Sequence, residues 1–492
     1  MSGYLSSEVM RARNSTLQWL PLIAMPFLAL ILIMQVSVDP RANVEAILNW
    51  QAIYLTGLAA PVAALFAASA ESREKQARFG GTLWRDTSAQ RQRAARLIVV
   101  LLSLFAFHLL NYGGAWAFAA LMGRIGSGRL LYLGMLAFIG VVGIAGLASA
   151  LARLTNLIVP VIVFLLWQMV GVSRNVVEGD FWWAWPMAWP VRLILPVAGI
   201  HQNAVALEPD SPLRAEKPWL ALGLCALLAL IGIGAALLTP EQTLQVKKRF
   251  KERAVPRPAV ALRSYGSAAA VALRSDARRP RPYAAITPAV MNAALLGCTA
   301  LALLVMVVAA MFYPVTILHG LFTYAVLPIG AGLMPVIIWP RLQKVWPLML
   351  TEYANSARVV LTWMLAYLAL VASIAAGLGL LAGGTFADEG RRFVLFAIVG
   401  GIVILISTQL VLRTGAATAI AAVLFMVILS VLVGGDVLAQ TMLWVFAFPA
   451  WPESATTPLR LTIAGILGTV MLLVLWMRTQ RLLERLIELV HS

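Results

Sequence analysis

The sequence TLWRDTSAQRQRAARLIVVLL, residues 82–102, recurs in related form as KVWPLMLTEYANSARVVLTWM, residues 344–364. Trp84 and Trp346 stand 262 residues apart, and the Ala-Arg pair that ends each polar segment keeps the same spacing. In both copies the polar segment separates two long apolar runs. A polar loop that is duplicated between apolar runs predicts a membrane protein made of two copies of one unit.

The composition is that of a chain lying mostly in a lipid bilayer. Of its 492 residues 61% are hydrophobic and only 12% are charged, with a mean hydropathy of +0.86. A soluble domain of this composition could not cover its surface with polar groups. We therefore expect an all-α integral membrane protein with about twelve transmembrane helices, each needing about 20 apolar residues. The expected spans are 17–37, 50–70, 97–122, 130–152, 157–174, 219–238, 289–312, 319–340, 359–381, 393–412, 416–434 and 459–477.

The basic residues predict the orientation. A formal net charge of +17 would suggest nucleic acid in a soluble protein, but here the charges fall between apolar runs, so no nucleic-acid partner is expected. With the N-terminus inside, 28 of the 38 lysines and arginines lie in cytoplasmic segments, whereas the acidic residues divide almost evenly. This bias predicts a multi-pass protein with both termini in the cytoplasm. Arg11 and Arg13 precede a span of full length, which is not the layout of a cleaved signal peptide.

The repeat extends to segments expected on the outer side. The sequence AWPMAWP (Ala184–Pro190) returns as AFPAWP (Ala447–Pro452), and Tyr54 and Tyr324 are 270 residues apart. Spans, polar loop and Trp-Pro segment follow in the same order in each half. This order predicts two parallel six-helix repeats.

The same order sets the domain boundaries. Residues 1–238 form a first six-span half, and residues 289–492 form a second half that ends in a short amphipathic helix. Residues 239–288 are rich in Arg, Pro, Ala and Ser without a sustained apolar period, which is typical of a cytoplasmic linker. Its basic runs could bind anionic lipid headgroups. A solvated tether is the simpler interpretation, because such charge runs have little specificity.

The sequence lacks the motifs of catalysis and metal binding. It contains no GxxxxGK[ST] stretch, so no phosphate-cradling loop for nucleotide hydrolysis is expected. The four histidines and the two cysteines, Cys225 and Cys298, do not have the spacing of a zinc site. We therefore expect no enzyme activity, no metal site and no cofactor in this chain.

The N-terminal sequence LSSEVMRARNSTLQWLPLIAMP, residues 5–26, predicts a short surface helix that leads into the first span. Together with ESREKQARFGGTLWRDTSAQRQRAAR, residues 71–96, it resembles the membrane subunits of ABC type-2 exporters, in particular the lantibiotic or bacteriocin self-protection permeases. The resemblance covers both halves in topology. In residues it is good over 1–100 and weaker over 341–360, and the second half lacks the acidic-then-basic opening before its first span.

The resemblance implies two six-span units that face each other above two soluble ABC ATPase subunits, which bind ATP and Mg. It also implies that the polar loops after the second and eighth spans couple the ATPases to the membrane. For the arginines of these loops, snorkelling at the membrane interface is at least as good an interpretation, whereas for the loops as units coupling is favoured. The positions that would touch or brace the ATPase are Glu71, Glu74, Trp84 and Arg96 in the first half and Trp346, Glu352 and Arg358 in the second.

The Trp-Pro segments are too apolar for free loops and too rich in proline for spans, which predicts half-helices that dip into the outer leaflet. The exporter family has such half-helices between its last two spans, and they would form an outer gate. An aromatic belt that only anchors the chain is the alternative, although it does not explain the repeated prolines. The gate residues would be Trp185, Pro186, Trp189, Pro190, Phe448, Pro449, Trp451 and Pro452.

Five polar residues lie inside expected spans: Gln51 and Tyr54 on one helix, and His108, Asn111 and Tyr112 on one face of another. Polar groups at membrane depth usually face protein or a cavity rather than lipid. Hydrogen bonding between helices is the commoner reason for them, and lining of a transport pathway is the alternative. No acidic residue is expected near the middle of a span, which argues against a proton- or sodium-coupled carrier.

Together with this resemblance, the sequence predicts the membrane subunit of an ATP-driven exporter in the bacterial inner membrane. It would move hydrophobic or amphipathic compounds, such as a peptide antibiotic or a lipophilic drug, out of the cell. Two other classes stay open. A proton-coupled secondary carrier of the major-facilitator kind also has six plus six spans, although its Asp-Arg-x-Gly-Arg-Arg loop is missing here. A membrane scaffold or sensor subunit that transports nothing is the third class.

Overall fold

A computed structural model gives the fold of the chain in ten described segments. These segments are 2–13, 15–37, 43–51, 54–78, 88–203, 205–240, 286–287, 290–352, 355–434 and 441–486. Trp84, the side chain of Glu352 and nearly all of the linker 239–288 fall outside the described residues, and so does the end of the expected C-terminal helix.

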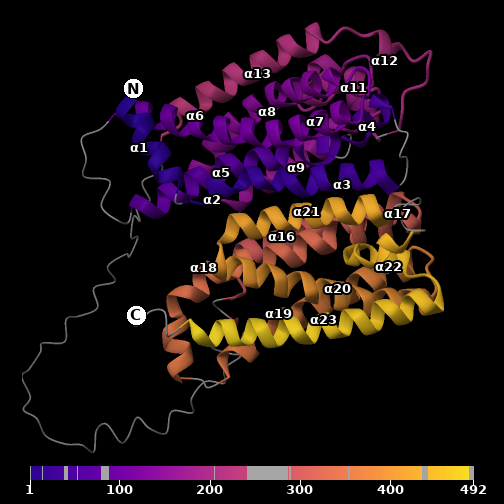
Figure 1. The fold of residues 1–492 in the computed structure, drawn as a ribbon. Coiled ribbons are helices and arrows are strands. Elements are labelled where there is room, and N and C mark those ends of the chain that lie inside the picture. The colour runs from indigo at the N-terminus through magenta and orange to yellow at the C-terminus, as the bar shows by residue number, and fades with distance from the viewer. Residues whose placement is uncertain are drawn as a thin grey trace, which may run out of the picture.

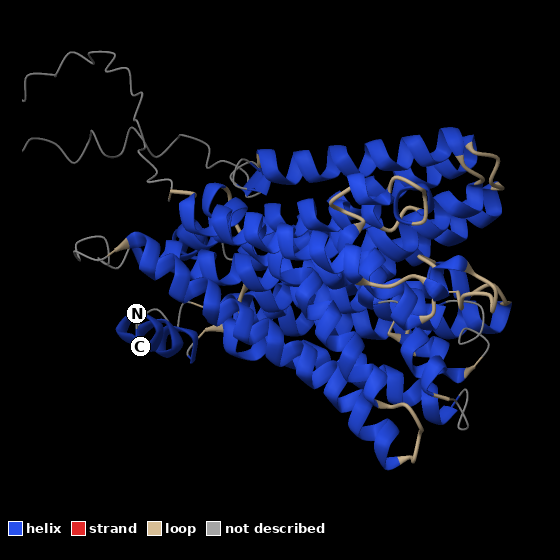
Figure 2. Ribbon diagram, turned by 90° about the horizontal axis from the view of Figure 1, so that it is seen from above, coloured by secondary structure: helices blue, strands red, loops and turns tan. Residues whose placement is uncertain are grey.

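The described residues form helices, with one isolated β-bridge and no strand (Figure 2). Polar caps begin several helices: the side chain of Asn43 accepts a hydrogen bond from the amide of Ala46 at 2.9 Å.

The first half comprises α1 (Ser2–Arg13), α2 (Thr16–Trp19), η1 (Leu20–Ile23), α3 (Ala24–Ser37), α4 (Val44–Trp50), η2 (Tyr54–Leu58), α5 (Ala59–Arg78), α6 (Ala89–His108), η4 (Leu109–Gly113), α7 (Gly114–Leu121), α8 (Gly128–Leu154), α9 (Ile158–Gly171), α10 (Arg174–Val177), η5 (Trp182–Ala184), α11 (Trp189–Ala198), α12 (Pro212–Ala215) and α13 (Trp219–Leu238).

The second half is built in the same way and ends in the long helix α23. Its elements are α16 (Ala293–Phe312), α17 (Val315–Leu321), η6 (Phe322–Val326), α18 (Leu327–Glu352), α19 (Ser356–Leu381), α20 (Phe386–Arg413), α21 (Ala416–Gly434), η8 (Met442–Val445), η9 (Phe448–Ala450), α22 (Trp451–Ser454) and α23 (Pro458–Arg485). The described part of the expected C-terminal amphipathic helix is not separate, because residues 478–485 continue α23 without a glycine, a proline or a turn.

Ten helical stretches of the described chain are long and apolar enough to cross a membrane. They coincide with ten of the twelve expected spans, so the chain is an all-α, multi-pass membrane protein. The other two expected spans, 157–174 and 416–434, correspond to the shorter apolar helices α9 and α21. Helix α9 ends at Gly171, where a β-carbon would lie only 2.2 Å from the carbonyl oxygen of Met187.

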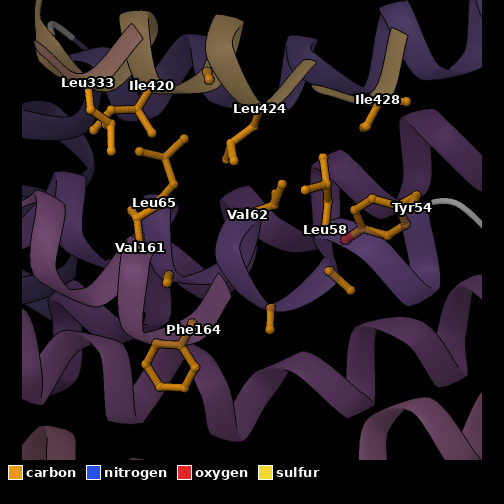
Figure 3. Packing of buried hydrophobic residues seen from close by; sticks show 14 of the residues in the cluster. Tyr54, Leu58, Val62, Leu65, Val161, Phe164, Leu333, Ile420, Leu424 and Ile428 are labelled. Carbon is orange, nitrogen blue, oxygen red and sulfur yellow. The ribbon is translucent and has the colours of Figure 1, made fainter. Parts of the chain in front are cut away.

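The two halves lie side by side as two layers of helices (Figure 1). Helix α5 of the first half packs against α21 of the second. Figure 3 shows the apolar side chains that meet between these helices. They are Leu58 at the end of η2, Val62 and Leu65 of α5, and Ile420, Leu424 and Ile428 of α21, all of them buried.

Glycines bring α8 and α13 into close contact within the first half. A β-carbon on Gly146 would lie 2.3 Å from the backbone of Gly232, and one on Gly143 would lie 2.6 Å from the backbone of Leu228. Small residues at such positions let transmembrane helices approach closely. This contact places the end of α8, with Arg153, beside the end of α13.

One helix in each half is interrupted at the same place. Helix α4 leads through the π-helical turn η2, which begins at Tyr54, into α5; helix α17 leads through the π-helical turn η6, which contains Tyr324, into α18. π-Helical turns are rare and often mark functional positions. Their occurrence at the two ends of the 270-residue spacing agrees with an internal repeat.

Candidate functional site

Helices α5, α8, α13, α18 and α23 end, and α6 and α19 begin, at one end of the bundle, which we call the basic end (Figure 1). The opposite end, which we call the Trp-Pro end, carries η5 and α11 in the first half and η9 and α22 in the second. Candidate functional residues gather at both ends and between the halves.

An ion-pair network is buried at the basic end of the first half. Nη1 of Arg96 donates to Oε2 of Glu71 at 2.6 Å, and Nε of Arg153 lies 3.3 Å from the other oxygen of Glu71. Nη2 of Arg96 lies 3.5 Å from a carboxylate oxygen of Glu74. The Arg96 side chain is 1% exposed. Arg96 is therefore an internal partner of two glutamates and does not snorkel.

The N-terminal helix α1 belongs to the same network. Arg11 donates to Glu74 at 3.1 Å, and Glu8 pairs with Arg73 of α5. Tyr4 of α1 accepts a hydrogen bond from the amide of Ser88, just before α6, at 3.2 Å. Sequence reasoning predicted the surface helix but not these contacts, because the partners lie more than 60 residues apart. The network as a whole contains four arginines (Arg11, Arg73, Arg96 and Arg153) and three glutamates (Glu8, Glu71 and Glu74).

The network continues to the end of α13, where the linker begins. Arg153 donates to the carbonyl of Thr239 at 3.0 Å and to that of Ala236, and Arg93 donates to the carbonyl of Leu237 at 2.9 Å. These are carbonyls of a last helical turn, which have no partner inside the helix. The network therefore joins α1, α5, α6, α8 and α13 into one unit at the basic end.

The second half has a different arrangement at the repeat-related positions. Trp346 is 3% exposed and its indole donates to the carbonyl of Leu483 at 3.1 Å, which ties the end of α18 to the end of α23. Arg358, the repeat partner of Arg96, is exposed. The two arginines of the repeat thus have opposite environments.

The last turns of α18 are amphipathic and bend across the basic end (Figure 1). Pro340 and Pro347 lie within this helix, and proline is a usual cause of such bends. The inner face buries Leu342, Trp346 and Met349. The outer face exposes basic and apolar side chains: Arg341, Lys344, Val345 and Leu348, the last 65% exposed.

The five polar residues predicted inside the spans come together. Tyr54 Oη lies 3.2 Å from Nε2 of His108, and Nδ2 of Asn111 donates to Oε1 of Gln51 at 3.0 Å. His108 stacks on Tyr112 with a ring separation of 6.0 Å. All five are buried. Their mutual contacts agree with hydrogen bonding between helices, the commoner of the two interpretations.

The Trp-Pro segments make similar contacts in the two halves, although not at strictly repeat-related positions. The indole of Trp189 donates to the carbonyl of Trp183 at 2.8 Å, and the indole of Trp451 donates to the carbonyl of Trp444 at 3.2 Å. An arginine lies over a tryptophan ring in each: Arg192 over Trp182 at 5.3 Å, and Arg460 over Trp444 at 5.2 Å. Of the expected gate residues, Trp189, Pro449, Trp451 and Pro452 are buried, Pro186, Pro190 and Phe448 are half-buried, and Trp185 is exposed.

Two acidic sites at the Trp-Pro end were not predicted as sites. Glu389 was expected in a loop, but Thr385 caps α20 so that the helix carries this carboxylate into the interior, 2% exposed and 2.7 Å from His319. The other site is in the first half, where His201 lies 3.1 Å from Glu178 and 2.8 Å from Glu208. Hydrogen bonds to Glu208, and then to Glu178, raise the pKa of His201.

An apolar cavity, which we call the inter-half cavity, lies between α9 of the first half and α16, α18 and α19 of the second. It encloses about 1150 Å³ of empty space including its open mouth. Two hydroxyls line it, those of Thr299 and Tyr367, and they bond to each other at 2.7 Å. Leu166 and Met169 on α9 are exposed at its edge. A ligand in this cavity would therefore contact almost only apolar side chains.

A second cavity, the inter-half vestibule, lies between the halves at the basic end. The residues around α2, together with the second half of α5, form one wall, and residues 414–418 before and within α21 form the other. It encloses about 1190 Å³ including its open mouth and is lined by both polar and apolar groups.

No family description, curated protein or solved structure matches this chain.

Proposed function

We propose that the chain is the membrane subunit of an ATP-driven exporter, with a separate ABC ATPase pair bound at its basic end. In this proposal α9 and α21 complete the set of twelve spans, the two halves are parallel six-helix repeats, and the basic end faces the bacterial cytoplasm together with both termini. The substrate is a hydrophobic or amphipathic compound that moves outward between the halves.

The observation that carries the proposal is the end of α18. Its inner face is fixed to α23 through Trp346 and Leu483, while its outer face presents Arg341, Lys344 and Leu348 to the solvent. Alternating basic and apolar side chains on a protruding helix suit a protein partner with acidic and apolar groups. A force applied to this face would act on α23 through the bond from Trp346 to Leu483. It would also act along α18 on the inter-half cavity, which α18 lines.

The first half supports the proposal in another way. The network around Glu71, Arg96 and Arg153 connects five helices at the end where the repeat-related polar loop begins. Breaking a buried ion pair costs about 3–5 kcal/mol, so these helices respond to a force as one body. A rigid body next to the loop is what a coupling element requires.

The test is copurification followed by hydrolysis. The full chain, carrying a tag, is purified from its native host in a mild detergent, and the proteins that accompany it are assayed for ATP hydrolysis. We expect an ATP-hydrolysing partner that is lost from Leu348→Asp but retained by Leu381→Asp, an apolar position at the Trp-Pro end that is even more exposed. Retention of the partner by Leu348→Asp would show that the outer face of α18 does not bind the ATPase.

One observation favours a second function, a proton-coupled secondary carrier. His319 and Glu389 form a buried titratable pair inside helices of the second half, and buried ionisable groups in membrane proteins often serve proton transfer. Transport that stops with an uncoupler, in vesicles without any ATPase, would establish this function in place of the exporter. Absence of both transport and partner would favour a scaffold or sensor subunit.

A further inference from the structure

The inter-half cavity has walls from both halves of the chain. Helix α9 of the first half forms one wall, and α16, η6, α18 and α19 of the second half form the others. Gln168 of α9 does not line the cavity but holds the π-helical turn η2: its side chain accepts a hydrogen bond from the amide of Ala60 at 3.0 Å and donates one to the carbonyl of Thr56 at 2.8 Å. A ligand in the cavity therefore contacts η6 directly and is linked to η2 through α9.

The cavity lies at the depth of the apolar spans. Tyr367, which lines it, stands near the middle of α19 (Ser356–Leu381). The exposed side chains at its edge, Leu166 and Met169, belong to the apolar helix α9. None of the described residues that line the cavity is charged. A charged group is costly at this depth unless it finds a partner, so the lining disfavours a charged ligand.

The two hydroxyl groups of the cavity decide which polar group a ligand can carry. A hydroxyl has one proton to donate and two lone pairs that accept. Thr299 donates its proton to the carbonyl of Leu295 at 2.9 Å, so in the bond of 2.7 Å between the hydroxyls Tyr367 is the donor. Both protons are then used and only lone pairs stay open to a ligand. The thiol of Cys298, which also lines the cavity, is a weak donor.

We propose that the inter-half cavity binds an uncharged apolar compound that carries one hydroxyl group, and that this group donates a hydrogen bond to Tyr367 or Thr299. The body of the compound contacts the apolar lining, whereas a carboxylate or another group that only accepts finds no strong side-chain donor among the described lining residues. This inference rests on the proposed function, because it narrows the class of substrate that moves between the halves.

The experiment measures saturable binding to the full chain in lipid nanodiscs, and empty nanodiscs give the background of partition into lipid. Three probes share one nonyl chain on a benzene ring. 4-Nonylphenol carries a hydroxyl that donates, its methyl ether 4-nonylanisole carries an oxygen that only accepts, and 4-nonylbenzoate is ionised at neutral pH. Comparison of the first two probes isolates the hydrogen bond from the burial of the hydrocarbon.

One variant removes the polar groups of the cavity and keeps the shape of its side chains. This is the double variant Thr299→Val with Tyr367→Phe. Its matched control is Thr469→Val with Tyr313→Phe. Thr469 also donates to a carbonyl four residues earlier, Tyr313 is exposed, and neither residue lines the cavity.

A second variant fills the cavity. Ala302 of α16 lines it, and Ala302→Phe places a ring in the space. Ala300→Phe makes the same change two residues away, at an exposed position of the same helix that does not line the cavity. Ala302→Phe should weaken the binding of both neutral probes at least about tenfold, and Ala300→Phe should leave it unchanged.

We expect the wild type to bind 4-nonylphenol about fivefold more tightly than 4-nonylanisole, since one net hydrogen bond changes an affinity by a factor of about two to ten. The benzoate should show no saturable binding. The double variant Thr299→Val with Tyr367→Phe should bind the phenol and the ether equally, with the affinity of the wild type for the ether. Its control should keep the preference for the phenol. A merely structural role of the two hydroxyls would change the binding of both probes and leave their ratio as it is.

Equal binding of the phenol and the ether by the wild type would overturn the proposal, by showing a site for hydrocarbon alone. A preference that survives the loss of both hydroxyls would overturn it too, and so would benzoate bound as tightly as the phenol. Unchanged binding in Ala302→Phe would place the site elsewhere.

The outcome is independent of the ATPase, because no ATPase is present in the assay. Selective binding of the phenol without a copurifying ATPase would retain the site and remove the exporter. A coupled ATPase together with unselective binding would retain the exporter and remove the site.

Discussion

Nη1 of Arg96 lies 2.6 Å from Oε2 of Glu71, and both side chains are almost completely buried. Arg358 stands at the repeat-related position of the second half and is exposed. The two arginines at repeat-related positions therefore differ in environment: Arg96 is a buried ion-pair partner, whereas Arg358 lies at the surface.

This contrast gives the first prediction. Arg96→Gln should lower the free energy of unfolding by about 3–5 kcal/mol, because it leaves Glu71 buried with one partner fewer. Arg358→Gln, the same change in the other half, should alter it by less than about 0.5 kcal/mol. Unfolding in detergent, followed by tryptophan fluorescence, measures both. Equal losses in the two variants would show that the buried pair is not the cause.

The second prediction concerns the bond from Trp346 to Leu483. Trp346→Phe removes the indole donor and should cost about 1–2 kcal/mol of stability, and it should loosen the link between α18 and α23. In the proposed complex with an ATPase, hydrolysis should then respond less to substrate. Trp219→Phe is the control, because Trp219 is 68% exposed. If both variants behaved alike, the tie between the two helix ends would have no role.

The third prediction concerns the close contact of α8 with α13. A methyl group added by Gly146→Ala would lie 2.3 Å from the backbone of Gly232, so the helices must separate. We expect a loss of about 1–3 kcal/mol and weaker contacts from Arg153 to the end of α13. Gly223→Ala on α13 meets nothing within 4 Å and should be neutral or slightly stabilising. Thermal unfolding of the two variants in detergent compares them directly.

The fourth prediction is a pH dependence at the Trp-Pro end. The pKa of His201 is raised by its hydrogen bonds to Glu208 and Glu178, and Arg174 lies 3.9 Å from Glu178. The stabilisation that protonation gives is complete below the ordinary histidine pKa of about 6.5 and is lost as the pH rises through the raised value. Amide exchange of Leu207, whose N–H bonds to Gly199, should therefore speed up at alkaline pH beyond the intrinsic rate.

The control for this prediction is His201→Gln. Its exchange rate, corrected for the intrinsic effect of pH, should be the same on both sides of the transition. A wild-type loop whose corrected exchange does not change between pH 5.5 and pH 8.5 would contradict the ionic tether.

Apolar run length predicted most of the spans, because burial in lipid demands a minimum number of apolar residues whatever the helices pack against. The ion-pair network could not be predicted in this way. Glu71 and Arg96 were both chosen as coupling positions, yet their pairing joins different helices, and no periodicity within one helix reveals it. From the sequence, snorkelling of Arg96 was at least as good an interpretation as contact with the ATPase, and its burial between two glutamates was not predicted.

Glu389 shows a second limit. The polar stretch around it suggested a loop, but the Thr385 cap allows α20 to begin at Phe386 and to carry the carboxylate inward. Its partner His319 lies 70 residues earlier on another helix. By contrast, the repeat of the Trp-Pro segments could be predicted from the sequence, because Trp189 and Trp451 keep the spacing of the repeat. In the structure both indoles also donate a hydrogen bond to a tryptophan carbonyl.

The proposed export is tested most directly by transport in vesicles that contain the chain and a copurified ATPase, with ATP supplied on the side of the basic end and a fluorescent amphiphile in the membrane. If the chain is an ATP-driven exporter, movement of the amphiphile should require ATP, continue in the presence of an uncoupler and be lost in Leu348→Asp. Movement that proceeds without ATP and stops with the uncoupler would contradict it.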